Sequence, residues 1–162
     1  MSDEVNHTKR PTGRFNWEFG AKHFHATTMS FAISPAWGVA GQVDQTSVEI
    51  GEPHLLLLEA ELGFDGLNDT FTLGPHVPNE KNPTLVVLTK TADGSRRDLA
   101  KGTVTLRISG SGFGVGIINA EVNKVRLRGD FAIADTSTST GATLKRVDGA
   151  RALESSLPYE KR

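Results

Sequence analysis

The sequence contains no cysteine and no long apolar run. Without cysteine, the chain cannot form disulfides, catalyse through a thiol, or hold a zinc ribbon or an iron–sulfur cluster through thiolates. No segment approaches the ~20 apolar residues that a membrane helix needs, so we expect no transmembrane segment. Aromatic residues make up only 7% of the chain, and the hydrophobic share of 37% is low but above that of disordered chains.

An excess of one sign of charge is also absent. Lys and Arg number 18 against 19 Asp and Glu, which gives a formal net charge of −1. A protein that mainly binds phosphate backbones carries a clear basic excess, so we expect no nucleic-acid partner. The N-terminal residues lack the apolar core of a secretion signal, which favours a cytoplasmic location.

Known catalytic signatures are missing as well. The sequence has no G-x-S-x-G elbow, no H-E-x-x-H pair, no Walker loop and no kinase set. Glu59 and Glu61 would share one strand face, as paired acids do, but outward acids are more often simply solvated. The sequence therefore predicts no catalytic residue, no cofactor and no metal, and it leans against an enzyme.

What the chain does contain is a two-residue alternation of apolar and polar side chains. Its 162 residues suit one domain. We place that domain at residues 14–147, between a polar N-terminal tail (1–13) and a polar C-terminal tail (148–162) with a possible short helix at 148–157. The predicted strands cover residues 15–19, 22–33, 39–50 with a break near Asp44, 55–64, 70–73, 84–91, 102–109, 110–119, 121–134 and 140–147, and Asp93-Gly94 begins a long turn.

These strands have the regular spacing typical of sandwiches and barrels, and they predict an all-β, largely antiparallel fold. Closure would remove the exposed edges of so large a sheet. We therefore expect a single antiparallel β-barrel of about eight to ten strands, closed in the manner of calycin and lipocalin barrels. A two-sheet β-sandwich is the alternative.

His23 and His25 form an H-x-H pair. On a strand both imidazoles project from one face, ~6.5–7 Å apart, a spacing that suits two ligands of a first-row metal. A metal needs further ligands, and His54, His76 and Glu59 are the only obvious candidates. Nothing in the sequence places those residues nearby, so polar residues on a solvated face or in a pocket remain the favoured interpretation.

The register of this pair favours the pocket. His23 and His25 share their parity with Phe31 in the predicted strand at residues 22–33. The row with the bulkier apolar side chains should face inward. We therefore expect both imidazoles to point toward the interior, unless a bulge interrupts the strand near Thr27.

Four glycines alternate with larger residues, at Gly110, Gly112, Gly114 and Gly116. Glycine weakens a strand, so the row requires a reason. Close packing of another element is the favoured one, with approach of a ligand or local flexibility as alternatives. A phosphate-binding loop is disfavoured, because neither a following Lys-Ser/Thr pair nor a strand–turn–helix context is present.

The strand at residues 121–134 has the clearest alternation. Its inward row is Val125, Leu127, Phe131 and Ile133, and its outward row is Lys124, Arg126, Arg128 and Asp130. With Arg107 and Lys101 on a neighbouring strand, the outward row could form a basic stripe for anions, nucleic acid or anionic lipid. An ordinary solvated face paired with Glu59 and Glu61 is favoured, because no aromatics interleave with the cations. The integrin-type tripeptide at 128–130 lies mid-strand rather than at a loop tip, so it is attributed to chance.

The leading functional hypothesis is a non-catalytic barrel that binds a small, largely apolar molecule in its interior. One alternative is a self-assembling scaffold subunit, such as a homo-oligomer, that uses tails and strand edges as contacts. Another is a cofactor-free cyclase, isomerase or lyase that acts by positioning its substrate. The predicted ligand-binding residues are Trp17, Phe19, His23, His25, Phe31, Leu58, Leu62, Leu106 and Phe131.

Overall fold

The computed structural model describes residues 12–32, 36–60, 67–74, 82–134 and 142–147, the last of these by its backbone only. It confirms the all-β prediction: the described residues contain strands and one 3-10 turn, η1 (Gln45–Ser47), but no α-helix. The strands are β1 (Thr12–Phe19), β2 (Lys22–His25), β3 (Thr28–Ala32), β4 (Trp37–Gln42), β5 (Pro53–Ala60), β6 (Asn68–Leu73), β7 (Thr84–Thr91), β8 (Gly94–Leu99), β9 (Lys101–Ile108), β10 (Gly114–Val122), β11 (Val125–Ala134) and β12 (Ala142–Val147).

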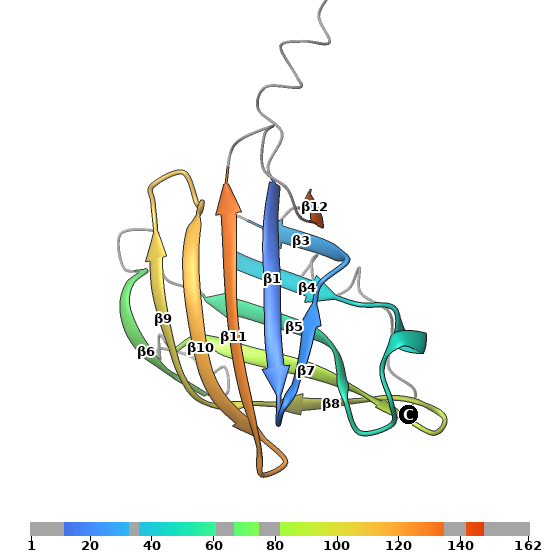
Figure 1. Cartoon of the computed structure of the whole chain (residues 1–162). Coiled ribbons are helices and arrows are strands. Elements are labelled where there is room, and N and C mark those ends of the chain that lie inside the picture. The colour runs from blue at the N-terminus through green and yellow to red at the C-terminus, as the bar shows by residue number, and fades with distance from the viewer. Residues whose placement is uncertain (1–11, 33–35, 61–66, 75–81, 135–141, 148–162) are drawn as a thin grey trace, which may run out of the picture.

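The strands form two layers (Figure 1). The first sheet has the order β6-β9-β10-β11-β1, with β2 also paired to β1, and the second has the order β3-β4-β5-β7-β8. β12 links them, because it pairs with β1 on one side and, in parallel, with β3 on the other. In Figure 1 the strands of the second sheet cross behind those of the first at a steep angle, as in orthogonal sandwiches.

The structure fits the sandwich alternative rather than the closed barrel. The hydrogen-bonded path ends at β6 and at β8, and these two strands do not pair with each other in the described part of the chain. The chain instead passes from one sheet to the other at Ala100, whose N–H donates to the Leu85 carbonyl at 3.0 Å. Alternation of side chains is the same in both architectures, because it reports which face is buried and not which strands pair.

A second correction concerns the predicted strand at residues 22–33, which is two strands in different sheets. The Ala26 N–H donates to the Phe15 carbonyl of the first sheet, and the Thr27 N–H donates to the Gln42 carbonyl of the second, both at 2.8 Å. The chain therefore changes sheets between these two residues. Phe24 of β2 has an even residue number and Met29 of β3 an odd one, and yet both side chains face the core. In one uninterrupted strand they would face opposite sides.

Turns account for the remaining differences. The predicted break near Asp44 is confirmed, because its carboxylate accepts the Thr46 N–H at 3.0 Å and caps η1. The predicted strand at residues 39–50 does not resume after this break, because β4 ends at Gln42 and residues 43–50 form no strand. The predicted long turn at Asp93-Gly94 is a tight hairpin into β8. The predicted strand at 121–134 begins at Val125, because Asn123 and Lys124 form a turn with φ of 53° and 66°. The predicted strand at 110–119 begins only at Gly114.

Candidate functional site

The apolar residues predicted to line a ligand pocket do meet, but as a packed core between the sheets. Trp17, Phe31, Leu58, Leu106 and Phe131 are all between 0% and 2% exposed. Phe19 is half-buried against the same cluster, and Leu62 lies outside the described residues. Such side chains touch one another at the density of a protein interior, which supports a structural role.

Aromatic rings from both sheets hold this core together. The Phe131 ring lies 5.5 Å from that of Phe15 in its own sheet and 5.8 Å from that of Trp37 in the other. The Trp37 indole N–H donates to the Gly112 carbonyl at 2.9 Å. The sequence prediction missed Phe15 and Trp37 as partners, because alternation identifies an inward residue but not its contact across the sandwich.

His23 and His25 do not face the interior, so this expectation is wrong. The His23 side chain is 69% exposed, and His25 is exposed as well. The physical reason is the change of sheet between Ala26 and Thr27. Because of it, the alternation of faces does not continue from the histidines to Phe31, so they need not face the same side. Both imidazoles instead lie on the outer face of the first sheet.

On that outer face the histidines border a groove of about 240 Å³. Four adjacent strands supply its walls, and cross-strand pairing sets their order. Glu18 of β1 lies opposite His23 on one side and Arg128 of β11 on the other. Asn16 lies in the same way between His25 and Asp130. The lining residues are Asn16, Trp17, Glu18, His23, Phe24, His25, Ile117, Ile118, Asn119, Arg128, Gly129 and Asp130.

Polar contacts order one side of this groove. The His25 Nδ1 and the Asn16 Oδ1 are 2.8 Å apart, and the His23 Nε2 lies 3.6 Å from the Glu18 Oε2. Arg128 and Asp130 have no ion pair within 4 Å among the described residues. Ile117, opposite Asp130, adds an apolar side chain that is 57% exposed. The groove therefore offers both signs of charge beside one apolar contact.

The structure does not assemble the metal ligands that the sequence suggested. Within the described residues, no three His, Cys, Asp or Glu side chains come together to hold a metal ion. His54 and Glu59 belong to β5 of the second sheet, and His76 lies outside the described residues. The H-x-H pair thus supplies two imidazoles without a third ligand in that part of the chain.

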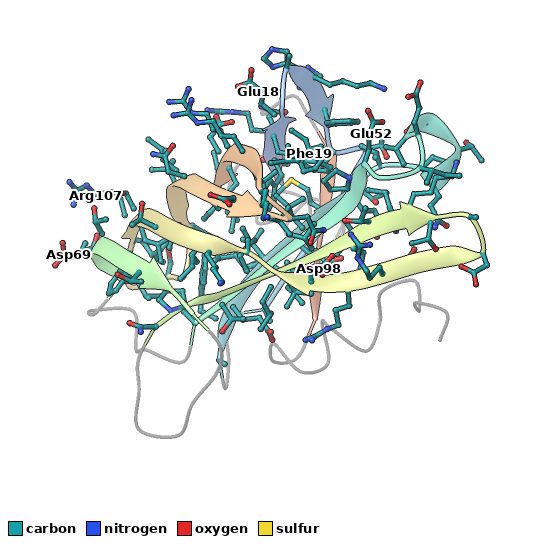
Figure 2. The ribbon with its side chains drawn as sticks, turned by 90° about the horizontal axis from the view of Figure 1, so that it is seen from below. Glu18, Phe19, Glu52, Asp69, Asp98 and Arg107 are labelled. Carbon is teal, nitrogen blue, oxygen red and sulfur yellow. The ribbon has the colours of Figure 1, made fainter. Side chains whose placement is uncertain are left out.

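The basic side chains of the first sheet do not form a continuous stripe. Glu121 separates Lys101 from Arg126 across three strands, and Lys124 lies in a turn. Figure 2 shows Arg107 near Asp69, far along the first sheet from Glu18. The solvated-face interpretation therefore fits, although the interleaved acid is Glu121 of the same sheet. Glu59 lies in the other sheet, and Glu61 is outside the described residues.

Two further sequence features have structural explanations. The tripeptide at 128–130 lies inside β11, paired on both sides, and not at a loop tip. In the glycine row, a Cβ at Gly116 would overlap the Phe131 ring, and one at Gly114 would overlap the Arg107 carbonyl. Gly112 has a φ of +89° in the turn before β10, while Gly110 meets nothing within 4 Å. Close packing thus explains the two glycines within the strand.

The sequence analysis did not predict a buried polar cluster around His54. His54 is 2% exposed, and its Nε2 lies 2.7 Å from the Ser95 hydroxyl, which accepts the Gln45 Nε2–H at 2.8 Å. Burial, followed by the charge of Lys90, lowers the pKa of His54 below its ordinary value. Although Ser–His contact is typical of nucleophilic catalysis, Ser95 is only 7% exposed. We assign this cluster to the support of the β4–β5 connection.

Comparisons with known proteins add no functional assignment. No protein-family model, no curated protein and no solved structure matches this chain. The part of the chain that the structure describes contains no helix long and apolar enough to cross a membrane. Function therefore has to be argued from the groove itself.

Proposed function

We propose that this protein is a non-catalytic binding module whose ligand site is the groove on the outer face of the first sheet. The observation that carries this proposal is the convergence of Glu18, Arg128 and Asp130 with exposed Ile117 in one hollow of about 240 Å³. Concave sites with a few placed polar groups are the usual location of small-molecule binding.

The packing of the interior favours this surface site over the internal pocket predicted from the sequence. An internal ligand would have to displace side chains such as Phe31 and Leu58, which are fully buried in the described core. Removing such contacts is costly, because each large core side chain contributes several kcal/mol (~2–5) to stability. The outer groove needs no such rearrangement.

The charges of the groove indicate the ligand chemistry. Arg128 and Asp130 are two residues apart on one strand face, ~6.5–7 Å along it. Each lacks an ion-pair partner in the described part of the chain, so both can pair with a ligand. A small zwitterion would satisfy both, with its carboxylate on Arg128 and its ammonium on Asp130. The groove is smaller than the ~300–1,000 Å³ of drug-sized sites, so the ligand is small.

Nuclear magnetic resonance titration with three matched probes tests this proposal. We expect leucine to shift the amide signals of β2 and β11, and 4-methylpentanoate and 3-methylbutylamine to bind more weakly, because each lacks one charge. Arg128→Gln should weaken leucine binding about tenfold, since a charge-assisted hydrogen bond contributes ~1.5–3 kcal/mol. Arg126→Gln, on the same strand face outside the groove, is the control. Equal effects of the two variants, or no shifts with any probe, would overturn the proposal.

One observation favours an enzyme as the second candidate. The His23 imidazole lies 3.6 Å from the Glu18 carboxylate in the groove, an arrangement that can serve general acid–base catalysis. Its exposure to solvent, 69% for the His23 side chain, makes binding the better supported function. Chemical conversion of a bound probe that is lost in His23→Gln but kept in His25→Gln would establish this alternative.

The scaffold hypothesis retains one supporting feature. Val115 and Ile117 are neighbours on the outer face of β10 and are 46% and 57% exposed. Apolar side chains gathered on a surface can mark a protein contact. Sedimentation equilibrium that shows an oligomer, and a monomer for Ile117→Asp, would favour self-assembly over small-molecule binding.

A further inference from the structure

The second sheet has an apolar outer face as well as an apolar inner face. Along β5, Leu56 and Leu58 point into the core between the sheets, and Leu55 and Leu57 point the opposite way. β7 repeats this arrangement. The outward side chains form a separate cluster that consists of Ala32, Ala40, Leu55, Leu57, Val86 and Leu88. We call this cluster the outer apolar face.

The outer apolar face is covered. Its six side chains are between 0% and 5% exposed. All other buried apolar residues in the described part of the chain belong to the core between the sheets. Figure 1 shows the first sheet against one side of the second sheet, and the core residues such as Leu56 and Leu58 face that side. No described strand therefore accounts for the burial of the outer apolar face.

We propose that the outer apolar face is a docking surface for the C-terminal segment of this chain, residues 148–162. The first argument is continuity. β12 ends at Val147, whose register partner in β3 is Ala32, a member of the face. The chain thus leaves the second sheet directly beside the surface that has to be covered.

The length of the segment matches the surface. From β3 to β7 the face extends across three interstrand spacings, about 14 Å. Ten residues span ~15 Å as a helix and more when extended. Residues 148–157 therefore reach the far side of the face in either conformation.

The sequence of the segment suits an apolar surface with a charged rim. Ala150, Leu153 and Leu157 recur at i, i+3 and i+7, the spacing that puts apolar side chains on one side of a helix. Acidic and basic residues lie between and after these apolar residues in the segment. The rim of the outer apolar face likewise carries an acidic residue, Glu59, and a basic one, Arg97. The opposite end of the chain suits the face less well, because residues 1–11 are largely polar.

Because the chain has no cysteine, disulfide trapping can test this docking in the full-length protein. Leu99 faces outward beside Val86 and is 40% exposed, so Leu99→Cys is tolerable at the edge of the face. Combined with Tyr159→Cys, it should form an intramolecular disulfide at least tenfold faster than the control pair Asn119→Cys and Tyr159→Cys. Asn119 is exposed on the first sheet, away from this face.

Equal trapping rates for the two pairs would overturn the proposal. A disulfide between two chains, detected by mass spectrometry of mixed isotope-labelled and unlabelled protein, would overturn it in favour of a second copy as the cover. A dye assay gives an independent measurement. The double variant Leu153→Asp and Leu157→Asp should raise the fluorescence of anilinonaphthalene sulfonate several-fold, and the control Ser155→Asp should not. Unchanged fluorescence in the double variant would also overturn the proposal.

Discussion

At the scale of single residues, two glycines before and within β10 differ in what surrounds them. A Cβ at Gly116 would enter the Phe131 ring and lie 3.0 Å from the Leu106 Cδ2. A Cβ at Gly110 would meet nothing within 4 Å. The same substitution should therefore have opposite effects at the two positions.

We expect Gly116→Ala to lower the free energy of unfolding by about 1–3 kcal/mol, because the added methyl overpacks the core. Gly110→Ala should be neutral or stabilise by about 0.4–1 kcal/mol, because it restricts only the unfolded chain. Urea unfolding curves of both variants measure these changes. A Gly116→Ala variant as stable as the parent would show that Phe131 can move aside.

The buried histidine predicts a pH dependence of stability. Burial keeps the pKa of His54 in the folded state below the ordinary 6.5, so the unfolded chain takes up a proton first as the pH falls. Its contribution to stability is complete above pH 6.5 and is lost as the pH falls through the folded-state pKa. Urea unfolding between pH 8 and about 5 should show this loss.

One variant isolates the residue responsible. His54→Gln should flatten the pH dependence in this window. Asp44, whose pKa is lowered by hydrogen bonds from Thr46, titrates below 3.8 and so outside the window. The same slope in His54→Gln as in the parent would assign the effect to another group.

At the scale of elements, the β10–β11 hairpin carries strain at its turn. Asn123 and Lys124 both have positive φ, at 53° and 66°, as the type I′ turn of a two-residue hairpin requires. Asn adopts this conformation readily, but for Lys it costs roughly 1–2 kcal/mol. Asn123 also lies within hydrogen-bonding distance of Asp98, at 3.3 Å, and so contacts the second sheet.

We expect Lys124→Gly to raise the free energy of unfolding by about 0.5–1 kcal/mol, because Asn-Gly suits this turn and the gain exceeds the extra entropy of the unfolded chain. Asn123→Gly should gain less, because it removes the contact with Asp98. Thermal or urea unfolding measures both changes. A loss of stability in Lys124→Gly would argue against positive φ at this position.

At the scale of the whole molecule, stability depends on contacts between the two sheets. Phe131 of the first sheet is 1% exposed and packs against Trp37 of the second. Phe131→Ala should cost about 3–5 kcal/mol through lost burial and the cavity left behind. Arg126→Ala, an exposed neighbour on the same strand, should change stability by less than about 1 kcal/mol. Equal, small effects in urea unfolding would mean that Phe131 does not hold the sheets together.

Alternation within one strand was predictable, and its continuation across a break was not. The sequence correctly placed Leu127 inward and Arg128 outward, because both lie within the uninterrupted strand β11. It placed His23 wrongly, because the chain changes sheets after His25. Odd-numbered residues therefore face outward in β2, before this point, and inward in β3, after it. The groove could not have been predicted, since it forms only where two local hairpins, β1–β2 and β10–β11, are joined by the pairing of β1 with the distant strand β11.

By itself, the sequence determined that this chain is all-β, that it has no thiol chemistry, and that rows such as Leu127 and Phe131 are buried. These properties depend on composition and on the two-residue period, which are local. Only the tertiary structure decided that the sheets remain open as a sandwich and that the histidines lie outside. It also decided that Leu55 and Leu57 require a cover beyond the first sheet. The physical reason is that pairing between distant strands and contacts between layers are non-local, so no window of sequence contains them.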